Sequence, residues 1–200
     1  MKRLPIMLIY SRLLIGGLLV ALSCWGAGRF AALAAGLLAL GVLTDVFDGI
    51  IARHLNVSTE KLRRLDSSVD QIFWALVLVA TYLARPEFFA HNAAKLWVLL
   101  ALEGLTYAVS FLKFRKEVAT HSWGAKAWVL VSFAALLQIL STGDSQVLFS
   151  ACFWFGVLSR VEIVAILLLL RRWANDVPTA YHALLLRQNK PIKRYKLLNG

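Results

Sequence analysis

Two short stretches of the chain, residues 45–53 (DVFDGIIAR) and residues 66–70 (DSSVD), carry four aspartates at helical spacing. The aspartates of the first stretch are three residues apart and those of the second are four apart, so each pair lies on one face of a helix. Like charges at this spacing repel one another unless a cation lies among them, and carboxylate oxygens suit hard ions such as Mg²⁺ or Mn²⁺. A metal site built from two helices is therefore predicted at Asp45, Asp48, Asp66 and Asp70.

Apolar side chains dominate the rest of the sequence. Of its 200 residues 60% are hydrophobic, and the mean hydropathy is +0.68, whereas roughly half of a soluble domain is apolar. Apolar runs long enough to cross a bilayer recur along the whole chain. The sequence therefore predicts an all-α polytopic integral membrane protein with six transmembrane helices, in which residues 1–175 form the membrane domain and residues 176–200 a basic cytoplasmic tail. The expected helices span residues 6–25, 29–53, 62–84, 93–111, 127–140 and 147–170.

Basic residues gather on one side of the predicted membrane helices. The net charge is +11, and the opposite side carries only Arg29, Arg85 and Lys95. Because Lys and Arg favour the cytoplasmic side, both termini and the aspartates are expected in the cytoplasm, at the inner membrane. The basic residues follow membrane topology and form no single stripe, so membrane lipid is an expected partner and nucleic acid is not. Two cysteines in apolar segments, Cys24 and Cys152, indicate neither a disulfide framework nor a zinc site.

Two charged residues inside apolar runs leave alternatives open. Arg12 lies two turns into the first run, and a charge inside the run favours a membrane helix over a removed leader peptide. Because such a charge costs about 3 kcal/mol on insertion scales, Arg12 either snorkels to the inner interface or pairs with a carboxylate or phosphate. Glu103 either pairs with Arg12 or Arg160, or stays neutral and hydrogen-bonded.

The two aspartate stretches resemble the signature of the CDP-alcohol phosphotransferase family, D-x2-D-G-x2-A-R-x8-G-x3-D-x3-D. Seven of its eight fixed positions match, and Leu62 stands where the family has its second glycine. If that glycine makes room for the nucleotide, Leu62 either points away or alters the pocket. The other interpretation of the stretch is a solvated loop between two membrane helices that binds nothing.

The resemblance implies transfer of a phosphatidyl or similar phosphoryl group from CDP-diacylglycerol, or another CDP-alcohol, to the hydroxyl of a small alcohol acceptor. CMP would be released, and the product would be a phospholipid or its precursor. The four aspartates would hold two Mg²⁺ or Mn²⁺ ions, and Asp70 would be the catalytic general base. Gly49, Ala52 and Arg53 would contact the CDP part. A homodimer is the family expectation.

A basic loop before the fifth expected helix offers phosphate ligands outside the signature. Lys126 is the first candidate, with Lys113 and Arg115 as further ones, and the alternative is an ordinary basic cytoplasmic loop. The second class of function is a non-catalytic membrane relative that binds metal or nucleotide without transfer, and Leu62 is the residue that supports it. Manganese-dependent release of CMP would separate the two classes.

Overall fold

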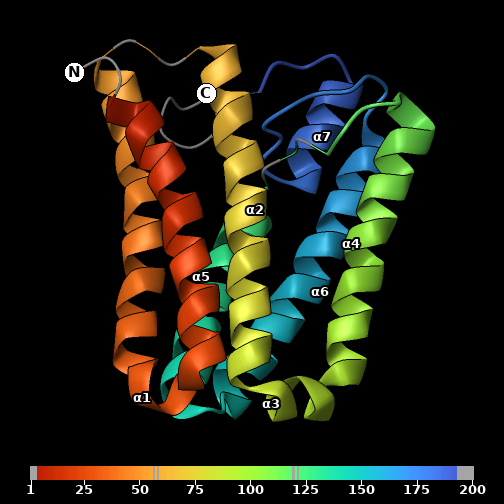
Figure 1. The fold of residues 1–200 in the computed structure, drawn as a ribbon. Coiled ribbons are helices and arrows are strands. Elements are labelled where there is room, and N and C mark those ends of the chain that lie inside the picture. The colour runs from red at the N-terminus through yellow and green to blue at the C-terminus, as the bar shows by residue number, and fades with distance from the viewer. Residues whose placement is uncertain (1–3, 56, 58, 119, 121, 193–200) are drawn as a thin grey trace. The chain divides into compact units, whose positions relative to one another are not determined.

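The computed structural model describes residues 4–55, 57, 59–118, 120 and 122–192, and among these it leaves the side chains of residues 26–30, 53, 60, 63, 64 and 67 undescribed. Within the described ranges every regular element is a helix, which confirms the predicted all-α class (Figure 1). The helices are α1 (Leu4–His54), α2 (Glu60–Ala84), α3 (Pro86–His91), α4 (Ala93–Phe114), α5 (Trp123–Thr142), α6 (Gln146–Leu169) and α7 (Ala180–Arg187). The chain divides into two compact units, one formed by Met1–His91 with Leu136–Ser145 and the other by Asn92–Ala135 with Gln146–Gly200.

Five segments of the described chain are long and apolar enough to cross a membrane. Two belong to α1, Leu4–Trp25 and Ala31–Ala52, and the others are α4, α5 and α6. The sixth expected membrane helix is α2, which contains the shorter apolar stretch Ser68–Ala84. The polytopic membrane architecture is confirmed.

The 51-residue α1 is a hairpin rather than one straight rod. A straight helix of that length would extend over about 75 Å, yet Arg12 Nη1 lies 2.6 Å from the carboxylate of Asp45, 33 residues further on. The chain reverses between the two apolar segments, and the two arms run antiparallel in Figure 1. The two apolar segments correspond to the membrane helices that the sequence predicts at residues 6–25 and 29–53.

Helix α2 packs closely on both arms of α1 through two glycines. A methyl group added at Gly16 would lie 2.7 Å from Leu76 Cδ1, and one added at Gly41 would lie 2.3 Å from Phe73 Cζ. No side chain fits at either position without displacing its neighbour, because van der Waals contact needs more than 3 Å. Phe73 and Val77 are fully buried at this junction. Gly16 therefore lets α2 approach the first arm of α1, and Gly41 lets it approach the arm that carries Asp45 and Asp48.

Two boundaries differ from the sequence prediction for local reasons. The expected outer loop after α2 contains the short helix α3, which begins at Pro86 and carries Glu87 in its first turn, a typical helix start. Helix α5 begins at Trp123, before the expected residue 127, because the Ser122 hydroxyl accepts a hydrogen bond from the Ala125 amide at 3.2 Å and caps the helix. Helix α2 is capped by Thr59, whose hydroxyl accepts a hydrogen bond from the Leu62 amide at 3.2 Å.

The second unit is built around α6. Its Gly156 admits the side chains of Leu99 from α4 and Trp128 from α5, and the Trp128 indole donates to the Cys152 carbonyl at 3.0 Å. Arg160 of α6 pairs with Glu103 of α4 and lies over the Trp128 ring at 4.1 Å. A charged group inside the helix packing is thus neutralised within the unit.

The segment after α6 folds back onto that helix. Ile166 and Leu170 form a buried apolar cluster with Val177 and with Ala183 of α7. The Trp123 amide donates to the Pro178 carbonyl at 3.0 Å, which fastens the same segment to the start of α5. The first part of the tail expected at residues 176–200 is therefore packed on protein as far as α7.

We expect Ala183→Asp to lower the unfolding temperature of the detergent-solubilised protein, because it places a carboxylate without a partner in this cluster. The cost of such a burial is about 3 kcal/mol. Gln188→Asp, one turn further on and exposed, is the matched control and should leave the temperature within about 1 °C. Equal thermal unfolding of both variants would contradict the docking of α7.

Candidate metal and phosphoryl-transfer site

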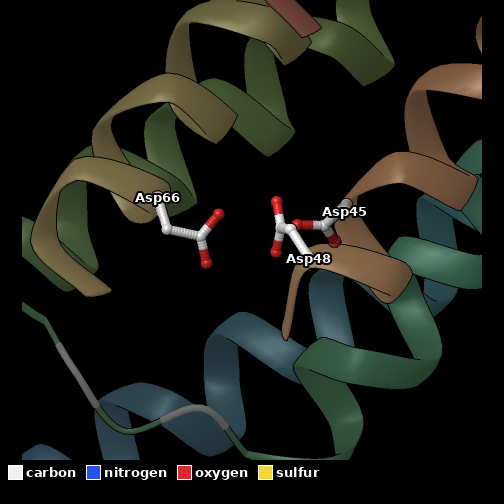
Figure 2. A group of neighbouring side chains, drawn as sticks. All are labelled: Asp45, Asp48 and Asp66. Carbon is white, nitrogen blue, oxygen red and sulfur yellow. The ribbon is translucent and has the colours of Figure 1, made fainter. Parts of the chain in front are cut away.

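Carboxylates from two helices converge in the first unit. Asp45 and Asp48 lie one turn apart on the second arm of α1, and Asp66 on α2 points toward them across the gap between the helices (Figure 2). Asp70 lies one turn further along α2, on the same face as Asp66. The structure therefore brings together all four aspartates predicted from their spacing.

The cluster is closed on one side and open on the other. The Asp48 side chain is 3% exposed, whereas the side chains of Asp45, Asp66 and Asp70 are 31–42% exposed. The buried side is lined by α1 and α2 themselves, where Ala52 and Val69 are buried. A ligand can therefore reach three of the four carboxylates from outside while the fourth is fixed in the helix interface.

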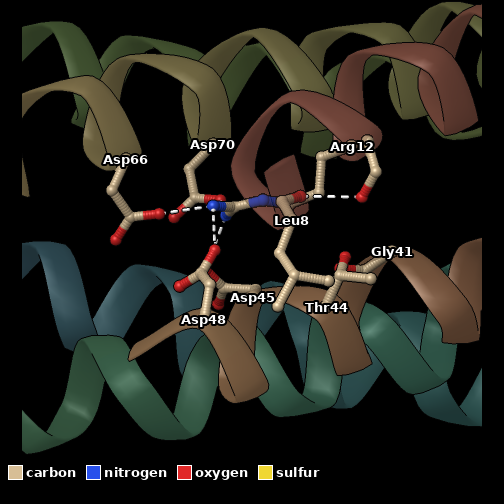
Figure 3. A network of polar contacts seen from close by, with 9 residues as sticks. Leu8, Arg12, Gly41, Thr44, Asp45, Asp48, Asp66 and Asp70 are labelled. Atoms are coloured by element: carbon tan, nitrogen blue, oxygen red, sulfur yellow. Dashed lines mark hydrogen bonds and ion pairs between the residues drawn. The ribbon is translucent and has the colours of Figure 1, made fainter. Parts of the chain in front are cut away.

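The fifth member of the cluster is Arg12, from the first arm of α1 (Figure 3). Its Nη1 donates to Asp45 Oδ1 at 2.6 Å and also to Asp70. Its Nη2 donates to Asp48 Oδ2 at 2.7 Å and also to Asp66. Of the two outcomes left open by the sequence, pairing with carboxylates is correct and snorkelling is wrong, since the Arg12 side chain is fully buried.

Three of the four carboxylates, those of Asp45, Asp48 and Asp66, lie close enough together to fit one hard divalent cation. One oxygen from each of Asp45, Asp48 and Asp66 lies within 4.8 Å of the others, and opposite ligands of an octahedral Mg²⁺ lie about 4 Å apart. The donor set is all oxygen, which hard ions prefer. The guanidinium of Arg12 shows that the centre of the cluster binds positive charge. Because four carboxylates face this one cation, the cluster can bind further positive charge.

The remaining predicted site residues lie in different places. Gly49 is half-buried directly after Asp48, and Ala52 is buried one turn beyond it. The side chain of Arg53 lies outside the described part of the chain. Lys126 is exposed in the first turn of α5, in the second unit. Contact of these residues with a substrate stays a prediction.

Leu62 and Lys113 are each engaged in local structure. Leu62 is half-buried in the first turn of α2, where its amide donates to the capping hydroxyl. The Lys113 ammonium donates to the carbonyls of Leu167 and Leu168 at 2.8 and 2.7 Å, so it caps the last turn of α6. Lys113 thus has a structural role that its place in a basic sequence did not indicate.

Residues 2–162 match the family model of the CDP-alcohol phosphatidyltransferases. The chain belongs to this family. The match covers α1 to most of α6, and it includes the complete acidic cluster with Arg12. Members of the CDP-alcohol phosphatidyltransferase family are membrane transferases that move a phosphatidyl group from a CDP-alcohol in phospholipid synthesis, and they generally use divalent metal ions.

One curated relative gives a partial match. It is an uncharacterized protein of Aquifex aeolicus (strain VF5), 33% identical over 115 residues, which cover 54% of this chain and 57% of the relative. The chain thus spans a little over half the length of this curated relative. No solved structure gives a significant match. The acidic cluster of this member of the CDP-alcohol phosphatidyltransferase family lies within the matched residues.

Proposed function

We propose that this CDP-alcohol phosphatidyltransferase transfers the phosphatidyl group of CDP-diacylglycerol to the hydroxyl of a small alcohol and releases CMP. The observation that carries the proposal is the meeting of four carboxylates, two from each of two membrane helices, around one buried guanidinium. Repulsion among the carboxylates in such an arrangement destabilises the fold, so a structural role alone does not explain it. Binding of divalent cations and a phosphorylated substrate accounts for both the residue type and the number.

The aspartates are proposed as the ligands of two Mg²⁺ or Mn²⁺ ions. Each terminal nitrogen of Arg12 contacts one carboxylate of α1 and one of α2, namely Asp45 with Asp70 and Asp48 with Asp66. The two terminal nitrogens thus mark two positions where a positive group contacts carboxylates of both helices, which supports the expectation of two ions. When bound, divalent ions neutralise the pyrophosphate and make CMP a better leaving group.

The reaction is a substitution at phosphorus. The acceptor hydroxyl oxygen forms a bond to the phosphorus that bears the diacylglycerol, and the bond from that phosphorus to the CMP oxygen breaks with its electron pair leaving on CMP. Asp70, which is partly exposed at the open side, is proposed to take the proton of the hydroxyl. Gly49, Ala52 and Arg53 follow Asp48 on the same arm and are proposed to contact the CDP part. Lys126 is proposed to bind a phosphate.

Charge distribution supports a cytoplasmic site. The sequence assigns most Lys and Arg residues to one side of the membrane helices and only Arg29, Arg85 and Lys95 to the other, which favours the cytoplasmic side of the inner membrane for both termini and the cluster. Donor lipid would enter laterally from the bilayer, and a water-soluble acceptor from the cytoplasm. We propose a homodimer, as is general for the family, with residues 1–175 as the catalytic membrane domain.

The test is CMP release by the purified protein in lipid nanodiscs that contain CDP-diacylglycerol. Glycerol phosphate, inositol phosphate and serine are offered in parallel as acceptors, with Mn²⁺, Mg²⁺ or EDTA. We expect CMP release with one acceptor and a divalent ion, and none with EDTA. A CDP-alcohol with a water-soluble alcohol replaces the lipid donor in a second series, and preference for that donor would contradict the proposed one.

Leu62 is the observation that favours a second candidate, a relative that binds metal or nucleotide without transfer. In that case Mn²⁺ would raise the unfolding temperature while no donor and acceptor pair releases CMP. Leu62→Gly, which restores the family residue, is the informative variant. Activity gained only in Leu62→Gly would identify the natural chain as the non-catalytic form.

A further inference from the structure

Arg12 occupies the place in which the proposed metal ions would be held. Its side chain is fully buried, and its two terminal nitrogens contact all four carboxylates of the cluster. The oxygens of Asp45, Asp48 and Asp66 that lie near enough to share one cation belong to the carboxylates that Arg12 binds. A guanidinium and a divalent ion at the same oxygens weaken each other's binding, because two cations held this close repel each other.

Among the described residues, the four carboxylates are the hydrogen-bond partners of the guanidinium. Its Nε is buried without a hydrogen-bond partner among the described residues. Arg12 reaches the cluster from a separate arm of α1, whereas the four carboxylates are on the second arm and on α2. Withdrawal of the side chain would therefore break ion pairs without breaking any backbone hydrogen bond of the helices that carry the aspartates.

The ion pairs of Arg12 also offset the repulsion among the four carboxylates when no metal is bound. Asp45 with Asp48, and Asp66 with Asp70, are like charges one turn apart, and the two pairs also face each other. An arginine fork bridges separate carboxylates where a lysine ammonium, a single point of charge, cannot span them equally well. Arg12 joins one carboxylate of each helix at each of its nitrogens, so it ties α1 to α2 at the site.

We propose that Arg12 is an exchangeable counter-ion: it holds the acidic cluster together in the metal-free protein and gives up carboxylate oxygens when divalent ions bind. This inference rests on the proposed metal site. Arg12 is then a positioning residue that lowers the affinity of the cluster for metal, since each ion must replace an existing ion pair. Metal affinity in the natural protein is then set by the difference in binding free energy between the metal ion and the Arg12 guanidinium at the same oxygens.

The test compares Mn²⁺ binding by the natural protein, Arg12→Gln and Arg12→Lys. Free Mn²⁺ is measured by electron paramagnetic resonance, and unfolding temperature is measured with and without the metal. We expect Arg12→Gln to bind Mn²⁺ about tenfold or more tightly, which corresponds to the loss of one competing charge-assisted contact. The metal-free Arg12→Gln protein should unfold at a lower temperature, and Mn²⁺ should raise that temperature by more than it does for the natural protein.

Arg12→Lys separates competition for oxygens from a general effect of charge. It keeps the positive charge but cannot bridge four carboxylates with two nitrogens, so we expect Mn²⁺ to bind it about threefold or more tightly than the natural protein. It also decides the matter if Arg12→Gln fails to fold. Arg160→Gln is the matched control, because it removes a buried arginine of α6 whose partner is Glu103. It should lower the unfolding temperature without changing Mn²⁺ affinity.

Each remaining outcome overturns a defined statement. Equal or weaker Mn²⁺ binding by Arg12→Lys would show that Arg12 does not compete for the oxygens, and the inference would fail while the metal site stands. Absence of Mn²⁺ binding to the folded natural protein and to both Arg12 variants would overturn the proposed metal site together with the inference. Tighter binding by Arg160→Gln as well would assign the effect to general loosening of the protein.

Discussion

Replacement of Asp70 by asparagine is expected to reduce CMP release by a factor of about 10² to 10⁴, the range that positioned proton transfer contributes. Asparagine keeps the size of the side chain and still accepts a hydrogen bond from Arg12 Nη1, so the contact seen in the structure has a substitute. It cannot take up a proton and carries no charge for a metal ion. The measurement is initial CMP release at saturating donor and Mn²⁺.

A carboxylate outside the cluster supplies the control for Asp70. Asp144 is exposed in the turn after α5, and its neutralisation in Asp144→Asn should leave turnover unchanged. Asp48→Asn extends the experiment, because Asp48 is the buried member of the cluster and is expected to matter for metal binding as well as for turnover. Turnover of Asp70→Asn within threefold of the natural protein would rule out its role as base.

A side chain at Gly41 is expected to have the second large effect. A methyl group there would lie 2.3 Å from Phe73 Cζ, and Phe73 is fully buried. Gly41→Ala should therefore cost about 1–3 kcal/mol through overpacking and lower the unfolding temperature. Gly41 lies one turn before Asp45, and Phe73 lies three residues after Asp70, so the same displacement should weaken Mn²⁺ binding.

Two variants make the Gly41 result specific. Gly36→Ala lies on the same arm of α1 with open space around its added methyl group, and it should be neutral or slightly stabilising because alanine favours helix. Phe73→Leu shortens the opposing side chain, so the Gly41→Ala, Phe73→Leu double variant should regain part of the lost stability. A neutral Gly41→Ala would mean that α1 and α2 are further apart than in the structure.

The sequence contains enough information for the helices and for the four aspartates of the site. Spacing alone places each pair of aspartates on one helical face, and the apolar runs predict the membrane helices. Helix ends were less predictable, since they depend on single capping groups. Ser122 starts α5 early, and Pro86 starts α3 inside an expected loop.

Partners across helices were beyond the sequence because they depend on packing. For Arg12 the residue type and its depth in an apolar run indicated a partner, but snorkelling fitted the same residues equally well. Glu103 had two candidate arginines, and the structure selects Arg160, which lies on the helix packed against α4. Lys113 looked like a phosphate ligand in a basic loop, whereas its ammonium is used by the last carbonyls of α6. Which charged residues pair depends on which helix faces pack together, and the residue pattern along the chain does not predict that packing.

The order of the charged residues along the chain has a consequence for biogenesis. Arg12 and the aspartates all occur within the first 70 residues, on consecutive membrane segments. Because synthesis proceeds from the N-terminus, every charge of the cluster is synthesised before α4, α5 and α6. An unpaired Arg12 would be unfavourable in lipid. Its carboxylate partners lie on the next two membrane segments to be synthesised, the second arm of α1 and α2.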